Sequence, residues 1–149
     1  MIVVRRFVEE NRLGKQVKML GAQPINVVHE YLARSSVFLQ HSIQTEDGWI
    51  EGWGVSIAEA AGAGIPIVAT RTGGIPDHVI DGITGLLVEQ KDWRGMALAM
   101  NRLARDPNLR LSMGSAGRVN IYKVGNADLQ ICKLFDLTKS LCTTKREGA

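Results

Sequence analysis

The segment Glu51–Thr70, EGWGVSIAEAAGAGIPIVAT, restricts the possible fold of this chain more than any other stretch. It predicts a glycine turn, a helix rich in small residues, a second turn and a buried strand. Gly52 and Gly54 leave the backbone bare where the helix begins, which permits close approach to a ligand. The next amides, at Val55 and Ser56, have no intrahelical partner and lie at the positive end of the helix dipole. The turn is therefore a candidate anion site, with phosphate as the most natural ligand.

Two carboxylates bracket this turn. Glu51 precedes it, and Glu59 follows eight residues later on the predicted helix. At a rise of about 1.5 Å per residue, eight helical residues span about 12 Å. This exceeds the roughly 5 to 9.5 Å between carboxylates that flank one scissile glycosidic bond. The spacing suits an elongated ligand with an anionic middle and hydroxyl groups at both ends, such as a sugar joined to a nucleoside through a diphosphate. Two solvated charges on a helix face would give the same spacing.

Apolar runs and helical patterns alternate along the rest of the chain. Strands are expected at 17–20, 37–40, 65–69 and 85–88. Helices are expected at 4–12 and from Pro24, Gly54 and Pro76. This alternation predicts an α/β fold, in which a Rossmann-like parallel sheet carries helices on both faces.

Three more helices are predicted after the last strand. Asp92 is the expected N-cap of the first, which ends before Asp106-Pro107, and the others are expected over 108–118 and around 129–136. The core side of the first helix is expected to contain its large apolar residues, Trp93, Met96 and Met100.

Two loops at predicted strand ends could border a ligand, because open α/β sheets bind ligands at the C-terminal ends of their strands. The first, after His41, contains Glu46, Asp47 and Trp49, and it fits either a sugar or acceptor site or a solvent-exposed insertion. The second contains Gly73-Gly74, which by itself fits a simple turn.

Composition excludes several functional classes. Of 149 residues, 45% are hydrophobic and 22% are charged, as in an ordinary globular domain, so disorder is not expected. The net charge of +3 is mildly basic, and no aromatic–basic patch accompanies it, so no nucleic-acid partner is predicted. Cys132 and Cys142 lack metal-ligand spacing, and the three histidines are scattered, so no metal site is expected and the thiols are expected to be reduced.

The stretch from Glu51 to Glu59 resembles the E-x7-E motif of retaining, GT-B-fold glycosyltransferases, the glycosyl transferase group 1 family. The resemblance continues through AEAAGAGIPIVATRTGGIPDHVIDGITGLLVEQKD. Members of the family are longer and have two domains, so the chain resembles most of the C-terminal, donor-binding half of a GT-B fold without its first strands. The resemblance implies an N-terminal helix over 1–16, a nucleotide-sugar-binding domain over 17–118, and a C-terminal helix and tail over 119–149.

The resemblance also implies roles for the bracketing glutamates. Glu59 corresponds to the residue that holds the nucleotide ribose, and Glu51 to the catalytic-site residue that faces the donor hexose. The backbone expected beside the sugar and diphosphate belongs to Gly52, Trp53, Gly54 and Val55. The implied activity is transfer of a hexose from a nucleotide-diphosphate sugar to a glycan or lipid-linked acceptor, with retention, in polysaccharide biosynthesis. No cofactor and no metal are implied.

The chain departs from the family before the matched region. The family's basic pair, which neutralises the departing diphosphate, has no counterpart among residues 1–16. The resemblance implies that the acceptor site belongs to an N-terminal domain or partner chain outside these 149 residues. We therefore expect the chain alone to bind a nucleotide sugar weakly and to transfer it poorly or not at all. The expected location is the cytoplasm, or the inner face of the membrane if the full enzyme associates with it peripherally.

Two other functions compete with this interpretation. A non-catalytic nucleotide-sugar-binding or partner-binding module, a degenerate glycosyltransferase fragment, would retain the same motifs. A dinucleotide-dependent oxidoreductase would share the βαβ pattern, but the chain has no G-x-G-x-x-G between an early strand and helix.

Overall fold

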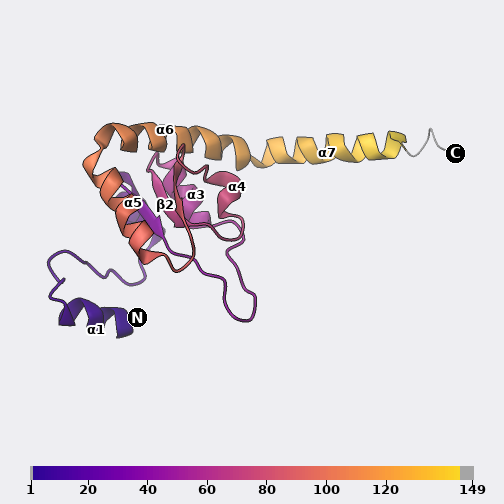
Figure 1. Cartoon of the computed structure of the whole chain (residues 1–149). Helices are drawn as coiled ribbons and strands as arrows, with labels where there is room; N and C mark the ends of the chain where they lie inside the picture. Colours follow the sequence, from indigo (N-terminus) through magenta and orange to yellow (C-terminus); the bar gives the residue numbers. More distant parts are fainter. Residues whose placement is uncertain (1, 145–149) are drawn as a thin grey trace. The chain divides into compact units, whose positions relative to one another are not determined.

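The computed structural model describes residues 2–144, with side chains from 3 to 136. The chain divides into two compact units, Met1–Tyr31 and Leu32–Ala149. The first contains α1 (Ile2–Glu10) and most of α2 (Ile25–Arg34). The second contains all the strands and the remaining helices that the structure describes (Figure 1).

The predicted strand at 17–20 is wrong. This segment joins no sheet ladder among the described residues, and the Val17 and Met19 side chains are exposed. The amides of Gln16 and Val17 instead donate to the Leu13 carbonyl oxygen, both at 2.9 Å, and so form a local turn after α1. A strand requires a neighbour for its backbone groups, and an apolar run alone does not provide one.

Three short parallel strands form the sheet of the second unit, in the order β1-β2-β3. They are β1 (Phe38–Gln40), β2 (Ile67–Thr70) and β3 (Gly85–Val88). Leu39 pairs with Val68, and Val68 pairs with Leu86 on the other side. All four residues of β2 are buried, as expected for a central parallel strand covered on both faces.

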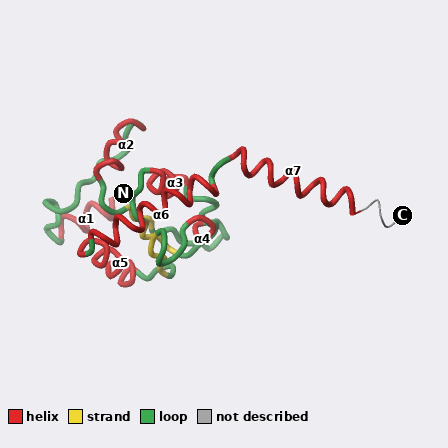
Figure 2. Tube along the Cα trace, turned by 90° about the horizontal axis from the view of Figure 1, so that it is seen from above, coloured by secondary structure: helices red, strands yellow, loops and turns green. Residues whose placement is uncertain are grey.

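Helices cover both faces of this sheet, so the predicted α/β fold class is confirmed (Figure 2). One face packs against α3 (Val55–Gly62) and α4 (Ile75–His78) through a cluster that includes Ile57, Ile67 and Ile75. The other packs against α5 (Trp93–Arg105) and α6 (Pro107–Val124), with Val68, Leu86, Met96, Leu103 and Met113 in its core. Successive side chains of β2 thus point to opposite layers.

The helices after β3 agree only in part with those predicted from the sequence. Asp92 caps α5 as predicted, because its Oδ1 accepts from the Gly95 amide at 2.8 Å. Met96 is buried, but Met100 is exposed and the prediction of a buried Trp93 is wrong, since its side chain is 67% exposed. As the first residue of the helix, Trp93 projects outward, and its ring lies 4.9 Å from the Arg94 guanidinium carbon.

The last two helices are longer than the predicted ranges. Asp106 caps α6, which extends to Val124, and α7 runs over Ala127–Thr144. The side chains of α7 that the structure describes, 127–136, are all exposed. Among residues 2–144, none of the helices combines the length and apolar character needed to cross a bilayer.

Candidate functional site

The N-terminus of α3 presents free backbone donors, as its sequence predicts. Gly54 is the N-cap in the left-handed conformation, with φ +71°, which favours glycine. Its carbonyl oxygen accepts from the amides of Ile57 and Ala58, at 2.9 and 3.1 Å, and so begins the helix. The amides of Val55 and Ser56 have no hydrogen-bond partner among the described residues. This turn of α3 can therefore receive an anion.

Glu51 is held by hydrogen bonds to both carboxylate oxygens. Its Oε1 accepts from the Gly54 amide at 3.0 Å, and its Oε2 accepts from Nε2 of Gln40 at 3.2 Å. Its backbone carbonyl accepts from the Gly74 amide at 3.1 Å. The half-buried carboxylate is thus fixed beside the first turn of α3.

The Gly73-Gly74 turn does more than reverse the chain. A Cβ atom at Gly73 would overlap the Glu51 carbonyl oxygen, and one at Gly74 would overlap the Gly52 carbonyl oxygen. The two turns therefore lie backbone against backbone, a distance that only glycine allows. The loop after β2 supports the loop that carries Glu51.

Trp53 anchors the same turn to α4, which is in turn bonded to α6. Its ring stacks on His78 of α4, with the ring centroids 4.4 Å apart, and its carbonyl oxygen bonds Nε2 of His78. His78 is only 3% exposed, and its own carbonyl oxygen accepts from Nδ2 of Asn120 on α6 at 2.8 Å. Nδ1 of His78 is buried without a partner among the described residues.

Glu59 lies in a different environment from Glu51. It is half-buried on α3, one helical turn after Val55, and its carboxylate makes no hydrogen bond or ion pair with any residue that the structure describes. Its acceptor oxygens are free for a ligand. The carboxylate of Glu51 is thus hydrogen-bonded by the protein, whereas that of Glu59 is unpaired among the described residues.

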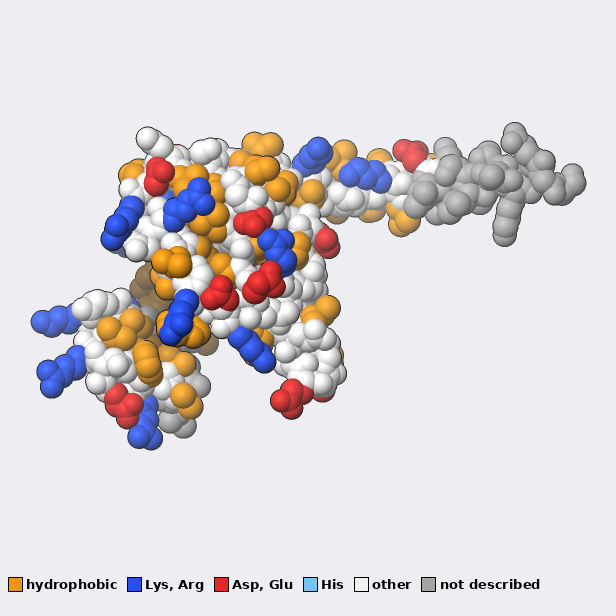
Figure 3. Space-filling view, in the orientation of Figure 1, with side chains coloured by type: hydrophobic (Ala, Val, Ile, Leu, Met, Phe, Trp, Pro, Cys, Tyr) orange, Lys and Arg blue, Asp and Glu red, His pale blue; other side chains and the backbone are white. Residues whose placement is uncertain are grey.

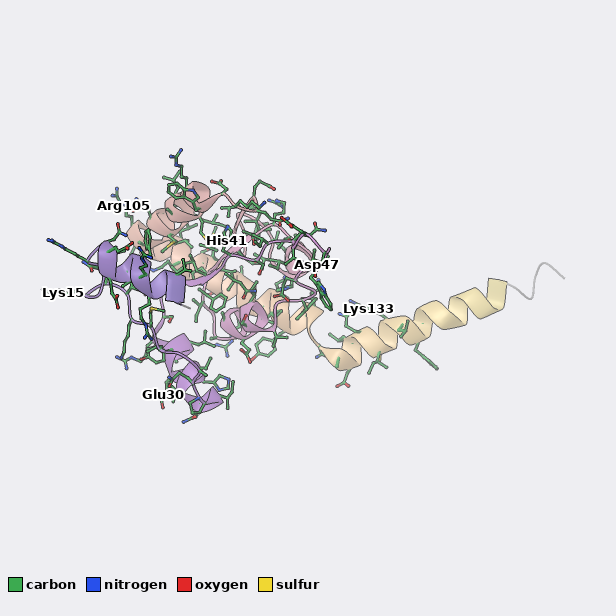
Figure 4. All side chains as sticks on the ribbon, turned by 90° about the horizontal axis from the view of Figure 1, so that it is seen from below. Lys15, Glu30, His41, Asp47, Arg105 and Lys133 are labelled. Atoms are coloured by element: carbon green, nitrogen blue, oxygen red, sulfur yellow. The ribbon has the colours of Figure 1, made fainter. Side chains whose placement is uncertain are left out.

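The loop from His41 to Ile50 is exposed, apart from the half-buried Ser42. In Figure 1 it projects from the sheet, and Figure 3 shows acidic side chains at its tip. Figure 4 labels His41 near the start of this loop and Asp47 near its tip. Thr45 and Trp49 close a turn at that tip, and the Trp49 side chain is 75% exposed. Near the loop's start, the Gln44 amide donates to Oε1 of Gln90 at 2.7 Å. The loop is therefore tethered near its base, with an exposed aromatic residue at its tip.

Comparison with known proteins identifies the family. Residues 3–120 match the family model described as glycosyl transferases group 1. The chain belongs to this family. The family membership inferred from the E-x7-E motif and the sequence that follows it is confirmed.

Two curated relatives of this group 1 chain are named as glycosyltransferases. The putative colanic acid biosynthesis glycosyltransferase WcaL of Salmonella typhimurium is 35% identical over 102 residues, which are 68% of this chain and 25% of WcaL. The amylovoran biosynthesis glycosyltransferase AmsK of Erwinia amylovora is 30% identical over 127 residues, or 85% of this chain and 29% of AmsK. The chain therefore spans less than a third of these relatives.

Solved structures share the fold. Sucrose-phosphate synthase from Thermosynechococcus elongatus superposes with a TM-score of 0.75 at 26% identity, over 95% of this chain and 34% of that protein. HepE from Anabaena, in complex with UDP, gives a TM-score of 0.76 at 20% identity, over 89% and 35% of the two chains.

Two residues of this group 1 chain that bond the Glu51–Gly54 turn, Gln40 and His78, are not predicted as site residues from the sequence. In the sequence, Gln40 is only the last residue of an expected strand, and His78 is one of three scattered histidines. Both bond the Glu51–Gly54 turn from elements distant in sequence. A polar residue at the C-terminal end of an expected parallel strand is the available signal for Gln40; no local pattern indicates His78. Among the described residues, no group of three or more His, Cys, Asp or Glu side chains could hold a metal ion.

Proposed function

We propose that this chain forms the donor-binding part of a glycosyltransferase. The reaction is transfer of a hexose from a nucleoside-diphosphate sugar, with retention, to a glycan or lipid-linked acceptor. Membership of the group 1 family supports the reaction class, and the names of WcaL and AmsK support an acceptor in polysaccharide biosynthesis. The UDP complex of HepE motivates nucleotides as the first probes.

The observation that carries the proposal is the first turn of α3. Its free amides at Val55 and Ser56 lie at the positive end of the helix dipole, where a diphosphate is stabilised. The backbone of Gly52, Trp53 and Gly54 leads into this turn and would flank the sugar. A nucleotide-sugar donor would therefore lie along this turn, with its negatively charged diphosphate at the N-terminus of α3.

The two glutamates would bind opposite ends of this donor. A carboxylate offers about four acceptor positions, and the protein uses two of those on Glu51. The other two remain for hydroxyl groups of the hexose. The unpaired carboxylate of Glu59 would accept from the ribose hydroxyls.

The leaving diphosphate needs more positive charge than this turn supplies. Arg71 follows β2 at the same edge of the sheet, but it is paired with Asp81 at 2.9 Å and Glu89 at 3.4 Å. We propose that basic groups and the acceptor site come from an N-terminal domain or partner chain of the complete enzyme. No cofactor or metal is part of the proposal.

Calorimetric titration with UDP, GDP, ADP and their hexose conjugates tests donor binding. One nucleotide class is expected to bind saturably, and Glu59→Ala should weaken it by at least about tenfold, because a hydrogen bond to a charged group is lost. Glu51→Gln should weaken only the hexose conjugate. Glu30→Ala, which removes an exposed helical glutamate from the first compact unit, is the matched control. A folded chain that binds none of these ligands would contradict the proposal.

A transfer assay separates the donor-binding role from its alternatives. The chain alone is expected to transfer sugar poorly, and to gain activity when a matching acceptor domain is added. Efficient transfer by the chain alone would show that no second part is required. Donor binding without transfer in either condition would identify a non-catalytic binding module.

A further inference from the structure

We propose that Gln40 is a positioning residue, which fixes the Glu51 carboxylate for the donor hexose and couples it to the anion-binding turn of α3. This inference rests on the proposed function. It concerns a residue at the end of β1 whose side chain does not need to touch the donor.

The amide of Gln40 bonds three side chains at the C-terminal edge of the sheet. Nε2 donates to Oε2 of Glu51 at 3.2 Å and to Oγ of Ser42 at 3.1 Å. Oε1 accepts from Oγ of Ser56 at 2.7 Å. Ser56 belongs to the first turn of α3, so one half-buried side chain joins the carboxylate to the helix N-terminus.

An amide is suited to this position because it combines two donors with an acceptor. A carboxylate at position 40 would repel Glu51, and an apolar side chain would leave both Glu51 Oε2 and the Ser56 hydroxyl without this partner. The backbone of β1 pairs with β2 whichever side chain is present. The strand therefore does not require glutamine; the network around Glu51 does.

The second anchor determines the plane of the Glu51 carboxylate. With the Gly54 amide alone, only Oε1 would be held, and the terminal torsion of a glutamate is broad. Bonds to both oxygens restrict that torsion, so the remaining acceptor positions keep fixed directions. A hexose then binds without the entropic cost of ordering the carboxylate.

Occupying the Ser56 hydroxyl has a further consequence. The bond from the Ser56 hydroxyl to Gln40 orients the Ser56 side chain, while the backbone amide of Ser56 remains free for the diphosphate. The hexose end and the diphosphate end of the site are therefore connected through one side chain. Loss of Gln40 should affect hexose binding far more than nucleotide binding.

A double-mutant cycle measured by calorimetry tests the inference. The probes are UDP with UDP-glucose, GDP with GDP-mannose, and ADP with ADP-glucose, and the pair that binds the parent chain is used. Gln40→Met should weaken the nucleotide sugar about tenfold and leave the nucleotide unchanged. In a Glu51→Ala background, the same substitution should change nucleotide-sugar affinity by less than about twofold, because Gln40 acts through Glu51.

Two further variants keep the test decisive. Ser56→Ala removes only the hydroxyl that Gln40 accepts, and it should weaken the nucleotide sugar about threefold. Gln130→Met removes an exposed amide bonded to the Val124 carbonyl. This control variant should bind the nucleotide and the nucleotide sugar with the same affinities as the parent chain. Urea unfolding of each variant reports whether it is folded.

The outcomes separate this inference from the proposed function. If the parent binds a nucleotide sugar, but Gln40→Met binds it equally well, or weakens nucleotide and nucleotide sugar alike, the positioning role is overturned and the function stands. Additive losses from Gln40→Met and Glu51→Ala would also overturn it. A folded parent that binds none of the three pairs overturns both.

Discussion

At the scale of single residues, the candidate site depends on two loops whose backbones touch. The Gly73-Gly74 turn leaves no room for a Cβ atom against the carbonyl groups of Glu51 and Gly52. The Gly74 amide also donates to the Glu51 carbonyl oxygen. The position of Glu51 is therefore set partly by residues that carry no side chain.

Gly74→Ala should lower the free energy of unfolding by about 2 kcal/mol, because the new methyl group overlaps the Gly52 carbonyl oxygen and must displace backbone. It should also weaken nucleotide-sugar binding. Gly62→Ala is the control, because a Cβ there meets no heavy atom within 4 Å, outside its own helix backbone, and alanine favours the helix by about 0.5 to 1 kcal/mol. Urea unfolding measures both. Equal stability of the two variants would contradict the prediction.

At the scale of elements, α6 holds the helices of the second unit together. Figure 1 shows it crossing from α5 toward α3 and α4, and its N-cap Asp106 accepts from the Leu109 amide at 2.9 Å. Its buried face contains Gly114, which lets it lie close to the turn between α3 and β2, and Gly117, which lies beside Thr84 and Ala61. Helix α3, which carries the candidate site, is positioned through this contact.

Gly114→Ala should therefore destabilise the protein by about 2 kcal/mol, although alanine favours a helix, because the added Cβ overlaps the Gly64 carbonyl oxygen. The neighbouring Ser115 is exposed, so Ser115→Ala should change the free energy of unfolding by no more than about 0.5 kcal/mol. Thermal and urea unfolding would measure the difference. A Gly114→Ala variant more stable than the parent would show that helix propensity outweighs the close contact.

At the scale of the whole molecule, the apolar core belongs to one of the two compact units. Both described core clusters, with the residues packed against them, lie between Leu32 and Met113. In the first unit, Val8 is the buried apolar residue among those described. Its described part therefore has little apolar burial of its own.

The fragment 32–149 should retain its sheet and unfold cooperatively, because it contains both clusters and all three strands. The fragment 1–31 should be largely unfolded alone, since chains below about 40 residues seldom bury enough surface. Circular dichroism and urea titration of both fragments check this. Loss of cooperative unfolding in 32–149 would show that the first unit is required for the core.

Local features of the sequence predicted much of this fold. Three of the four strands expected from apolar runs are present, Gly54 marks the start of α3, and Asp92 caps α5 as predicted. Each signal acts within a few residues through backbone conformation, capping or strand burial. The E-x7-E spacing and the sequence that follows it also indicated the family, and the comparison confirmed it.

The contacts between distant segments are set by the tertiary structure. The apolar run at 17–20 forms no strand because no ladder partner is present among the described residues, and Trp93 is exposed because of its place in α5. Gln40 reaches Glu51 across eleven residues, and His78 reaches Trp53 across twenty-five. Local sequence patterns specify most of the strands, turns and helices, but they do not show that the 17–20 segment lacks a strand to pair with. Packing of the helices against the sheet decides which side chains meet, because it brings together residues that are far apart in the sequence.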